Sequence, residues 1–87
     1  MGEITVNYHG VVMTATKRTS ETFTLPDNGI KASELTKLIV SRYPNTGIDR
    51  VLEQSRWIVD GSSIDPLGSF VFEEGEDVDI IPRMVGG

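Results

Sequence analysis

The amino-acid sequence predicts one α+β domain, in which a mixed sheet of four to five strands packs on one main helix. Three observations predict this class. Polar and apolar residues alternate over residues 3–9, a helical period runs over residues 32–43, and a final apolar run covers residues 77–82. A length of 87 residues supports one hydrophobic core. We therefore expect a folded domain over residues 1–82 and a flexible tail over residues 83–87.

The first two strands are expected to form an antiparallel hairpin. Ile4, Val6 and Tyr8 point to one side of the first strand, and the residues between them point to the other side. A polar turn at residues 16–20 leads to a second strand at residues 22–25. The sequence Pro-Asp-Asn-Gly ends that strand, because proline and glycine favour turns. Strands that follow each other so closely usually pair.

The main helix is predicted from Ala32 to Tyr43. Glu34 lies in its first turn, where a negative charge is favourable, and Ser33 or the residues before it are candidates for the N-cap. The sequence from Pro44 to Gly47 ends the helix. One face of the helix carries the apolar residues Ala32, Leu35, Leu38, Ile39 and Tyr43. This face is wide enough to cover one side of a small sheet.

The second half of the chain is predicted to supply the remaining strands. Residues 56–59 form an apolar strand that ends at the turn Asp60-Gly61, and residues 62–65 add a brief edge strand. A short apolar run at residues 70–72 precedes an acidic turn. We place the final strand, residues 77–82, beside the first strand in the middle of the sheet. The result is a β-grasp layout, in which the C-terminus leaves a central strand as an exposed tail.

Composition and charge exclude several kinds of function. The hydrophobic fraction of 38% and the charged fraction of 24% are typical of a folded domain. No apolar stretch is long enough to span a membrane and no signal peptide is evident, so we expect a cytoplasmic protein that does not bind membranes. A net charge of −5 argues against nucleic acid as a partner. Because the chain has no cysteine, sulfur chemistry cannot use a side-chain thiol.

Catalysis by side chains of this chain is not expected. His9 is the single histidine, so it cannot form a histidine metal cluster or a catalytic triad, and we place it at an exposed strand position. Trp57 lies in an apolar strand and is interpreted as a core residue. No carboxylates pair for acid-base chemistry or metal binding, and no glycine-rich sequence has phosphate-loop spacing. We expect no metal and no bound cofactor.

The terminal pair Gly86-Gly87 is the feature that says most about function. Glycine has no Cβ, so the pair can pass through a narrow channel and place its carboxylate among a partner's catalytic groups. Two terminal glycines arise by chance in about 0.5% of chains, so the pair alone is a weak signal, and an unselected end is the alternative. Its position after a predicted strand and Pro82 strengthens the interpretation.

Two further features suggest how a partner recognises the domain. A group of acidic residues lies close to the tail in the sequence, and it is interpreted either as a solubilising turn or as a surface that steers a basic partner. We also expect a recognition surface where the helix leaves the sheet open, in the first and final strands and at Phe70 or Phe72. The acidic group consists of Glu73, Glu74, Glu76, Asp77 and Asp79.

These residues together resemble a ubiquitin-like sulfur carrier of the MoaD/ThiS family. The resemblance covers nearly the whole sequence and includes the strand at residues 4–8, the helix end at residues 42–44 and the strand and turn at residues 57–61. It is strongest at the C-terminus. The sequence EGEDV at residues 74–78 is similar to the family's acidic Asp-Gly-Asp-Glu-Val turn, and IPRMVGG at residues 81–87 is similar to its Pro-Pro-Val-x-Gly-Gly tail.

The resemblance implies a chemistry for Gly87. A ubiquitin-activating-type adenylyltransferase would use ATP to adenylate this glycine, and a sulfur donor would convert the acyl-adenylate to a thiocarboxylate. The chain would then be a carrier and not an enzyme, and a partner would recognise the tail residues Pro82, Arg83, Met84, Val85 and Gly86. Arg83 stands where the small subunit of molybdopterin synthase usually has a second proline, which weakens an assignment to molybdopterin synthesis.

Three functions remain open at this point. A sulfur carrier would deliver its sulfur to a synthase that makes molybdopterin, thiamine or another sulfur-containing metabolite. A ubiquitin-like modifier would join the activated Gly87 to a lysine of a target protein. A plain β-grasp interaction domain would have an inert end. The first two functions share one acyl-adenylate and differ only in the nucleophile that follows, so the sequence does not separate them.

Overall fold

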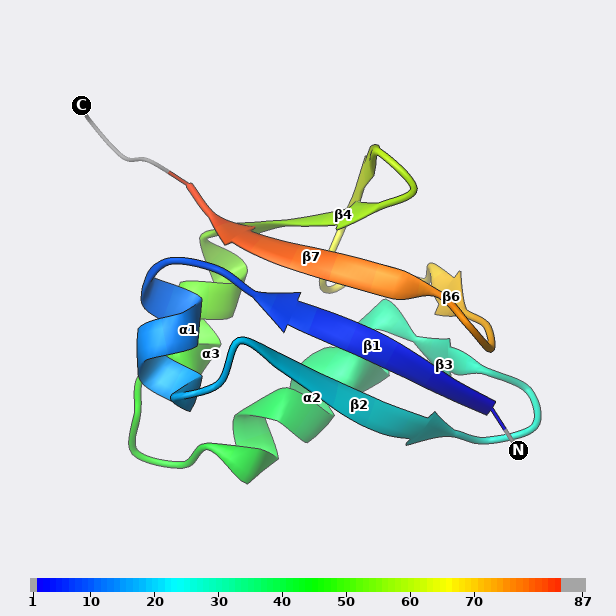
Figure 1. The fold of residues 1–87 in the computed structure, drawn as a ribbon, viewed down its shortest axis with the longest axis horizontal. Coiled ribbons are helices and arrows are strands. Elements are labelled where there is room, and N and C mark those ends of the chain that lie inside the picture. Colours follow the sequence, from blue (N-terminus) through cyan, green and yellow to red (C-terminus); the bar gives the residue numbers. More distant parts are fainter. Residues whose placement is uncertain (1, 84–87) are drawn as a thin grey trace.

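The computed structural model describes residues 2–83. Their main feature is a five-stranded mixed sheet with the strand order β2-β1-β7-β4-β5 (Figure 1). Its strands are β1 (Gly2–Tyr8), β2 (Ser20–Leu25), β4 (Ser55–Val59), β5 (Ser62–Ile64) and β7 (Asp77–Pro82). A second, small sheet pairs β3 (Ile30–Lys31) with β6 (Val71–Phe72). No helix within these residues is long and apolar enough to cross a membrane.

The final strand β7 lies in the middle of the sheet, as predicted. It runs parallel to β1, where Val6 is opposite Val78, and antiparallel to β4, where Trp57 is opposite Ile80. The pairing of β1 with β2 is antiparallel, which confirms the predicted hairpin. Because β1 and β7 are parallel, their C-terminal ends lie at the same edge of the sheet. The end of β7 at Pro82 therefore lies beside the end of β1 (Figure 1).

Helix α2 (Ala32–Arg42) covers one face of the sheet and confirms the predicted main helix (Figure 1). Its buried side includes Leu35 and Ile39, which have no exposed surface. The helix begins with a hydrogen bond in which the backbone N–H of Lys31 donates to the Glu34 carboxylate at 3.1 Å. This contact satisfies a backbone donor that the first helical turn would otherwise leave free.

Two short helices were not predicted from the sequence. Helix α1 (Val11–Thr16) buries Val12 and Thr16, which lie one turn apart, and it consists mainly of valine and threonine, residues with low helix propensity. Helix α3 (Ile48–Glu53) buries Ile48 and Leu52 with the same spacing. Each helix is too short for its own hydrogen bonds to stabilise it, so packing against the domain core determines its conformation.

The core lies between the sheet and the helices. Trp57 is completely buried in β4, which confirms its interpretation as a core residue. Its ring centroid lies 6.3 Å from that of Phe72. Within the described residues, the indole N–H of Trp57 is the only buried side-chain nitrogen or oxygen that has no hydrogen-bond partner. Such a donor costs about 1–3 kcal/mol, which the burial of the large ring offsets.

Candidate functional site

The base of the tail is held on both sides of β7. On the β4 side, the backbone N–H of Arg83 donates to the carbonyl of Gln54 at 3.1 Å. On the β1 side, the backbone N–H of His9 donates to the carbonyl of Ile80 at 3.2 Å. Pro82 is half-buried, and Arg83 is exposed. The chain is therefore fixed as far as Arg83, while the predicted site residues 84–87, including Gly87, the residue predicted to be adenylated, lie outside the described residues.

The turn after β1 packs directly against the tail base. Gly10 has a φ of 57°, and a Cβ at this position would lie 2.9 Å from Cγ of Pro82. The position therefore favours glycine both for its backbone conformation and for the space that Pro82 occupies. The sequence pattern predicted only a turn at Gly10. The contact with Pro82 was not predictable, because the two residues are far apart in the sequence.

His9 pairs with a residue that sequence reasoning did not connect to it. The Nε2 atom of His9 lies 3.0 Å from Oδ1 of Asp79, a residue 70 positions later in the chain. Both side chains are about half exposed, at 48% and 43%. His9 was predicted at an exposed strand position; it is exposed, and it lies one residue beyond the end of β1. The parallel register of β1 and β7 brings the pair together, and no local pattern reveals that register.

The acidic group lies at the opposite end of the domain from the tail. Glu73, Glu74 and Glu76 belong to the turn before β7, and Asp77 is the first residue of the strand (Figure 1). Six residues of strand, or roughly 18 Å, separate this turn from the tail base. The group is close to the tail in the sequence, but in space it lies at the far end of β7 and does not border the tail base. Only Asp79 lies farther along β7.

Basic side chains gather at the tail end instead. Arg83 is exposed at the tail base, and Arg56 of β4 is opposite Ile81 of β7. Lys17 and Arg18 follow α1, which lies at the same end of the long axis (Figure 1). Carboxylates accompany these cations, because Glu53 lines the same groove as Arg56 and Arg83, and Asp79 contacts His9. The tail end therefore carries charges of both signs, and the far end carries a dense group of carboxylates.

The open face of β1 and β7 is mainly polar, which corrects the expected apolar recognition surface. Phe72 has no exposed surface because it packs in the core, so it is not a surface candidate. Phe70 is 37% exposed, and its ring centroid lies 5.0 Å from that of Phe72. In β1 and β7, exposed or half-buried residues alternate with core residues. They include Thr5, Asn7, Asp77 and Asp79, and Ile81 follows the last core residue.

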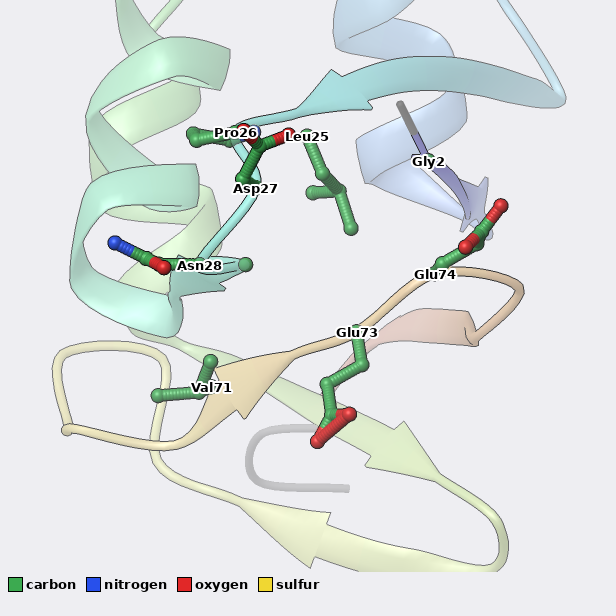
Figure 2. A pocket seen from close by; sticks show the side chains of 9 residues that line it. Gly2, Leu25, Pro26, Asp27, Asn28, Val71, Glu73 and Glu74 are labelled. Atoms are coloured by element: carbon green, nitrogen blue, oxygen red, sulfur yellow. The ribbon is translucent and has the colours of Figure 1, made fainter.

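A cavity of about 430 Å³ lies at the acidic end and not at the tail (Figure 2). Figure 2 shows the carboxylates of Glu73 and Glu74 pointing away from one another. Within residues 2–83, no group of three or more potential metal-ligating side chains could hold a metal ion. The cavity is lined by Gly2, Leu25, Pro26, Asp27, Asn28, Gly29, Val71, Glu73 and Glu74. It has no connection to the candidate site.

A largely buried carboxylate fixes the end of the main helix. Glu21 accepts hydrogen bonds from the hydroxyls of Tyr8, at 2.9 Å, and Tyr43, at 2.6 Å, and from the guanidinium of Arg42. The Arg42 guanidinium also lies 4.5 Å from the centroid of the Phe23 ring. The side chain of Glu21 is only 8% exposed. This network joins α2 to β1 and β2, so its role is structural.

The same network determines the ionisation of its members. Burial by itself raises the pKa of Glu21, but the hydrogen bonds from Tyr43, Tyr8 and Arg42 outweigh burial, and the net pKa lies below the ordinary value. Burial and the neighbouring Glu21 carboxylate both raise the pKa of Tyr8 and of Tyr43. The two phenols therefore remain protonated hydrogen-bond donors at neutral pH.

Comparison with known proteins identifies relatives across nearly the full chain. The sequence is 33% identical over 86 residues to the molybdopterin synthase sulfur carrier subunit of Mycosarcoma maydis, and the match covers 97% of this chain and 92% of that protein. No family model matches the sequence.

Two solved structures have the same fold. SAMP1 from Haloferax volcanii superposes with a TM-score of 0.77 at 14% identity, covering 99% of this chain and all of that one. Urm1 from Trypanosoma brucei superposes with a TM-score of 0.75 at 20% identity, covering 99% of this chain and 96% of that one. These structures confirm the β-grasp fold, and the identity to the sulfur carrier subunit shows the family. The chain belongs to the MoaD/ThiS-like sulfur carrier family of ubiquitin-like β-grasp proteins.

Proposed function

We propose that the chain is a sulfur carrier whose C-terminal Gly87 is adenylated by a ubiquitin-activating-type enzyme and then converted to a thiocarboxylate. The observation that carries this proposal is the tail base, Pro82 and Arg83, which is fixed at the end of the central strand β7. The structure holds the chain firmly as far as Arg83, and four residues that end in Gly-Gly follow. A fixed base and a slim end suit a carrier whose terminus must enter another protein's active site. The 33% identity to a sulfur carrier subunit supports the same function.

The chemistry requires two substitutions at the terminal carboxyl group. A carboxylate oxygen of Gly87 attacks the α-phosphorus of ATP, and pyrophosphate leaves. Hydrosulfide then attacks the carbonyl carbon of the acyl-adenylate, AMP leaves, and the product loses a proton to give the thiocarboxylate. ATP and the catalytic groups belong to the partner. Because the sequence contains no cysteine, the transferred sulfur resides on the terminal carbonyl and not on a side chain.

The acceptor is proposed to be a sulfur-accepting synthase in the cytoplasm. The identity to a molybdopterin synthase subunit favours a synthase of molybdopterin. Arg83 differs from the family's second proline, but its backbone N–H makes a hydrogen bond to Gln54 that a proline cannot make. This bond gives the position a local structural reason to depart from the family pattern. A synthase of another sulfur-containing metabolite is the alternative acceptor.

A second candidate function is that of a protein modifier. The fold is similar to that of a protein named small archaeal modifier protein 1, from Methanosarcina acetivorans, with a TM-score of 0.74. In this function the amine of a target lysine attacks the same acyl-adenylate, and an isopeptide bond replaces the thiocarboxylate. Both functions require activation of Gly87, and a lysine-bearing protein takes the place of the synthase.

Intact-mass spectrometry distinguishes the candidates. The purified chain is incubated with the adenylyltransferase of the same organism, ATP and a sulfide source. Replacement of oxygen by sulfur adds about 16 Da and indicates a carrier, while conjugates to lysine indicate a modifier. A variant without Gly86-Gly87 is the control, and it should show neither product. If the mass of the wild-type chain does not change and no conjugates form, both candidate functions are contradicted. A β-grasp interaction domain with an inert end is then the favoured function.

A further inference from the structure

The loop between β2 and β3 contains the dipeptide Asn28-Gly29, and the fold requires its glycine. Gly29 has a φ of 79°, and a Cβ at this position would lie 2.5 Å from the carbonyl oxygen of Phe72. Both the backbone conformation and the close approach of β6 therefore disfavour a side chain here. As a result, the backbone nitrogen that follows Asn28 has no side chain beside it to shield it.

An unshielded backbone nitrogen can attack the side-chain amide of the preceding asparagine. The nitrogen of Gly29 loses its proton and bonds to Cγ of Asn28, and Nδ2 leaves with a proton as ammonia. The product is a cyclic succinimide, which water opens. Cleavage of the bond from the nitrogen to Cγ gives aspartate. Cleavage of the bond from the nitrogen to the backbone carbonyl carbon gives isoaspartate, in which the chain runs through Cγ.

Asn28 is the asparagine of this chain that best permits this reaction. The sequence has three asparagines, at positions 7, 28 and 45. Asn7 lies within β1, which pairs with β2 on one side and β7 on the other, and the large Tyr8 follows it. Asn45 is followed by Thr46, whose branched Cβ crowds the backbone nitrogen. Asn28 is exposed and lies outside the helices and strands.

A hydrogen bond of the turn opposes the attack while the loop is closed. The backbone N–H of Gly29 donates to the carbonyl of Pro26 at 3.0 Å. The nitrogen must lose this same proton before it bonds to Asn28, so the turn has to open first. Residues 26–28 are all exposed, and exposed loops open locally far more often than a domain core does.

We propose that Asn28 is a site of spontaneous deamidation in the folded chain, through attack by the nitrogen of Gly29, and that opening of the turn hydrogen bond to Pro26 limits its rate. The reaction needs water as its only co-reactant. The inference is independent of the proposed function, since it involves neither the tail nor an activating partner.

Both products change the acidic end of the domain. The new carboxylate joins those of Asp27, Glu73 and Glu74, which line the same cavity as Asn28 (Figure 2). Isoaspartate also adds one carbon to the backbone just before Ile30, which is buried and begins β3. The added charge is repelled by its neighbours, and the added carbon disturbs the position of β3.

Peptide mapping by mass spectrometry follows the reaction in the full chain. The folded chain is incubated at mildly alkaline pH, and the same chain in guanidinium chloride is the unfolded reference. Deamidation adds about 1 Da, which should be located at Asn28 and divided between aspartate and isoaspartate. The folded chain should react at least about tenfold more slowly than the unfolded one. Asn28→Gln should abolish the gain, while the matched control Asn45→Gln should retain it. Thermal unfolding checks that both variants fold.

Each part of the inference has its own contrary result. If the folded chain gains no mass at Asn28 while the unfolded chain reacts completely, or if Asn45 reacts faster in the folded chain, the site is overturned. If aspartate forms without isoaspartate, direct hydrolysis by water replaces the attack by Gly29. If the folded and unfolded chains react at the same rate, the hydrogen bond to Pro26 does not limit the reaction.

Discussion

Replacement of Glu21 by glutamine probes the network that joins the main helix to the sheet. The change preserves size and removes the charge that accepts three hydrogen bonds. Glutamine has one acceptor oxygen, and its amide group donates, so it cannot accept from Tyr8, Tyr43 and Arg42 in the same geometry. At least one donor loses its partner, and Arg42 loses its counter-ion.

The expected loss of stability follows from the individual contacts. A hydrogen bond to a charged group contributes about 1.5–3 kcal/mol and a neutral one about 0.5–1.5 kcal/mol, so each tyrosine contact loses about 1 kcal/mol. The Arg42 side chain is 48% exposed, and solvent screening limits its ion pair to at most about 1 kcal/mol. The free energy of unfolding should therefore fall by about 2–3 kcal/mol. For a domain of this size, that lowers the melting temperature by roughly 10–20 °C.

The pH dependence identifies the carboxylate as the cause. The pKa of Glu21 is lower in the folded chain than its ordinary value of 4.5, so the carboxylate stabilises the fold fully above pH 4.5. That contribution is lost as the pH falls through the folded-state pKa. The stability difference between wild type and Glu21→Gln, measured by denaturant unfolding, should be full at pH 7 and shrink below pH 4.5. Glu73→Gln is the exposed control. A difference below about 0.5 kcal/mol at pH 7, or one that persists unchanged at low pH, refutes the reasoning.

Substitutions at three other positions test the core and the tail base. Trp57→Phe removes the unpartnered N–H but leaves a small cavity, so it should cost less than about 2 kcal/mol in denaturant unfolding, whereas Trp57→Ala should cost about 3–5 kcal/mol. Gly10→Ala should destabilise the chain more than Gly47→Ala by at least about 1 kcal/mol in thermal unfolding. Gly47 is in the left-handed region with open space around it, whereas Gly10 has a φ of 57° and a ψ of −129°, a conformation that strains alanine, and also contacts Pro82. Equal losses would contradict this combined effect of conformation and contact. Arg83→Pro should lower the unfolding free energy by about 1 kcal/mol through loss of its backbone hydrogen bond, with Arg83→Ala as the neutral control.

The sequence was sufficient to predict the fold but not the surroundings of the tail. The alternation around Ile4, the helical period from Ala32 and the apolar final strand are local patterns that burial imposes directly. The predicted place of the final strand followed from the need to hydrogen-bond its buried backbone on both sides. Helix α1 was missed because valine and threonine favour strands, and tertiary packing of Val12 overrides that preference.

The candidate site was predictable only in the residues that are contiguous in sequence. The Gly-Gly end and Pro82 are adjacent in the chain, so the pattern itself reveals them. The contact of Gly10 with Pro82 depends on the parallel register of two strands at opposite ends of the chain. The acidic turn precedes β7, so it lies at the other end of this strand from the tail base, although the two are close in sequence. The direction of β7 therefore decides at which end of the domain the acidic turn lies.

The central place of β7 also has a consequence for synthesis of the protein. The strand that joins β1 to β4 is the last one to leave the ribosome, and the sheet cannot close before it inserts. The tail base is fixed by backbone contacts to His9 and Gln54, so those contacts form only when that insertion is complete. An unfinished or misfolded chain therefore presents no ordered tail base beside α1. A partner that recognises the ordered tail base would therefore bind completed molecules and not incomplete chains.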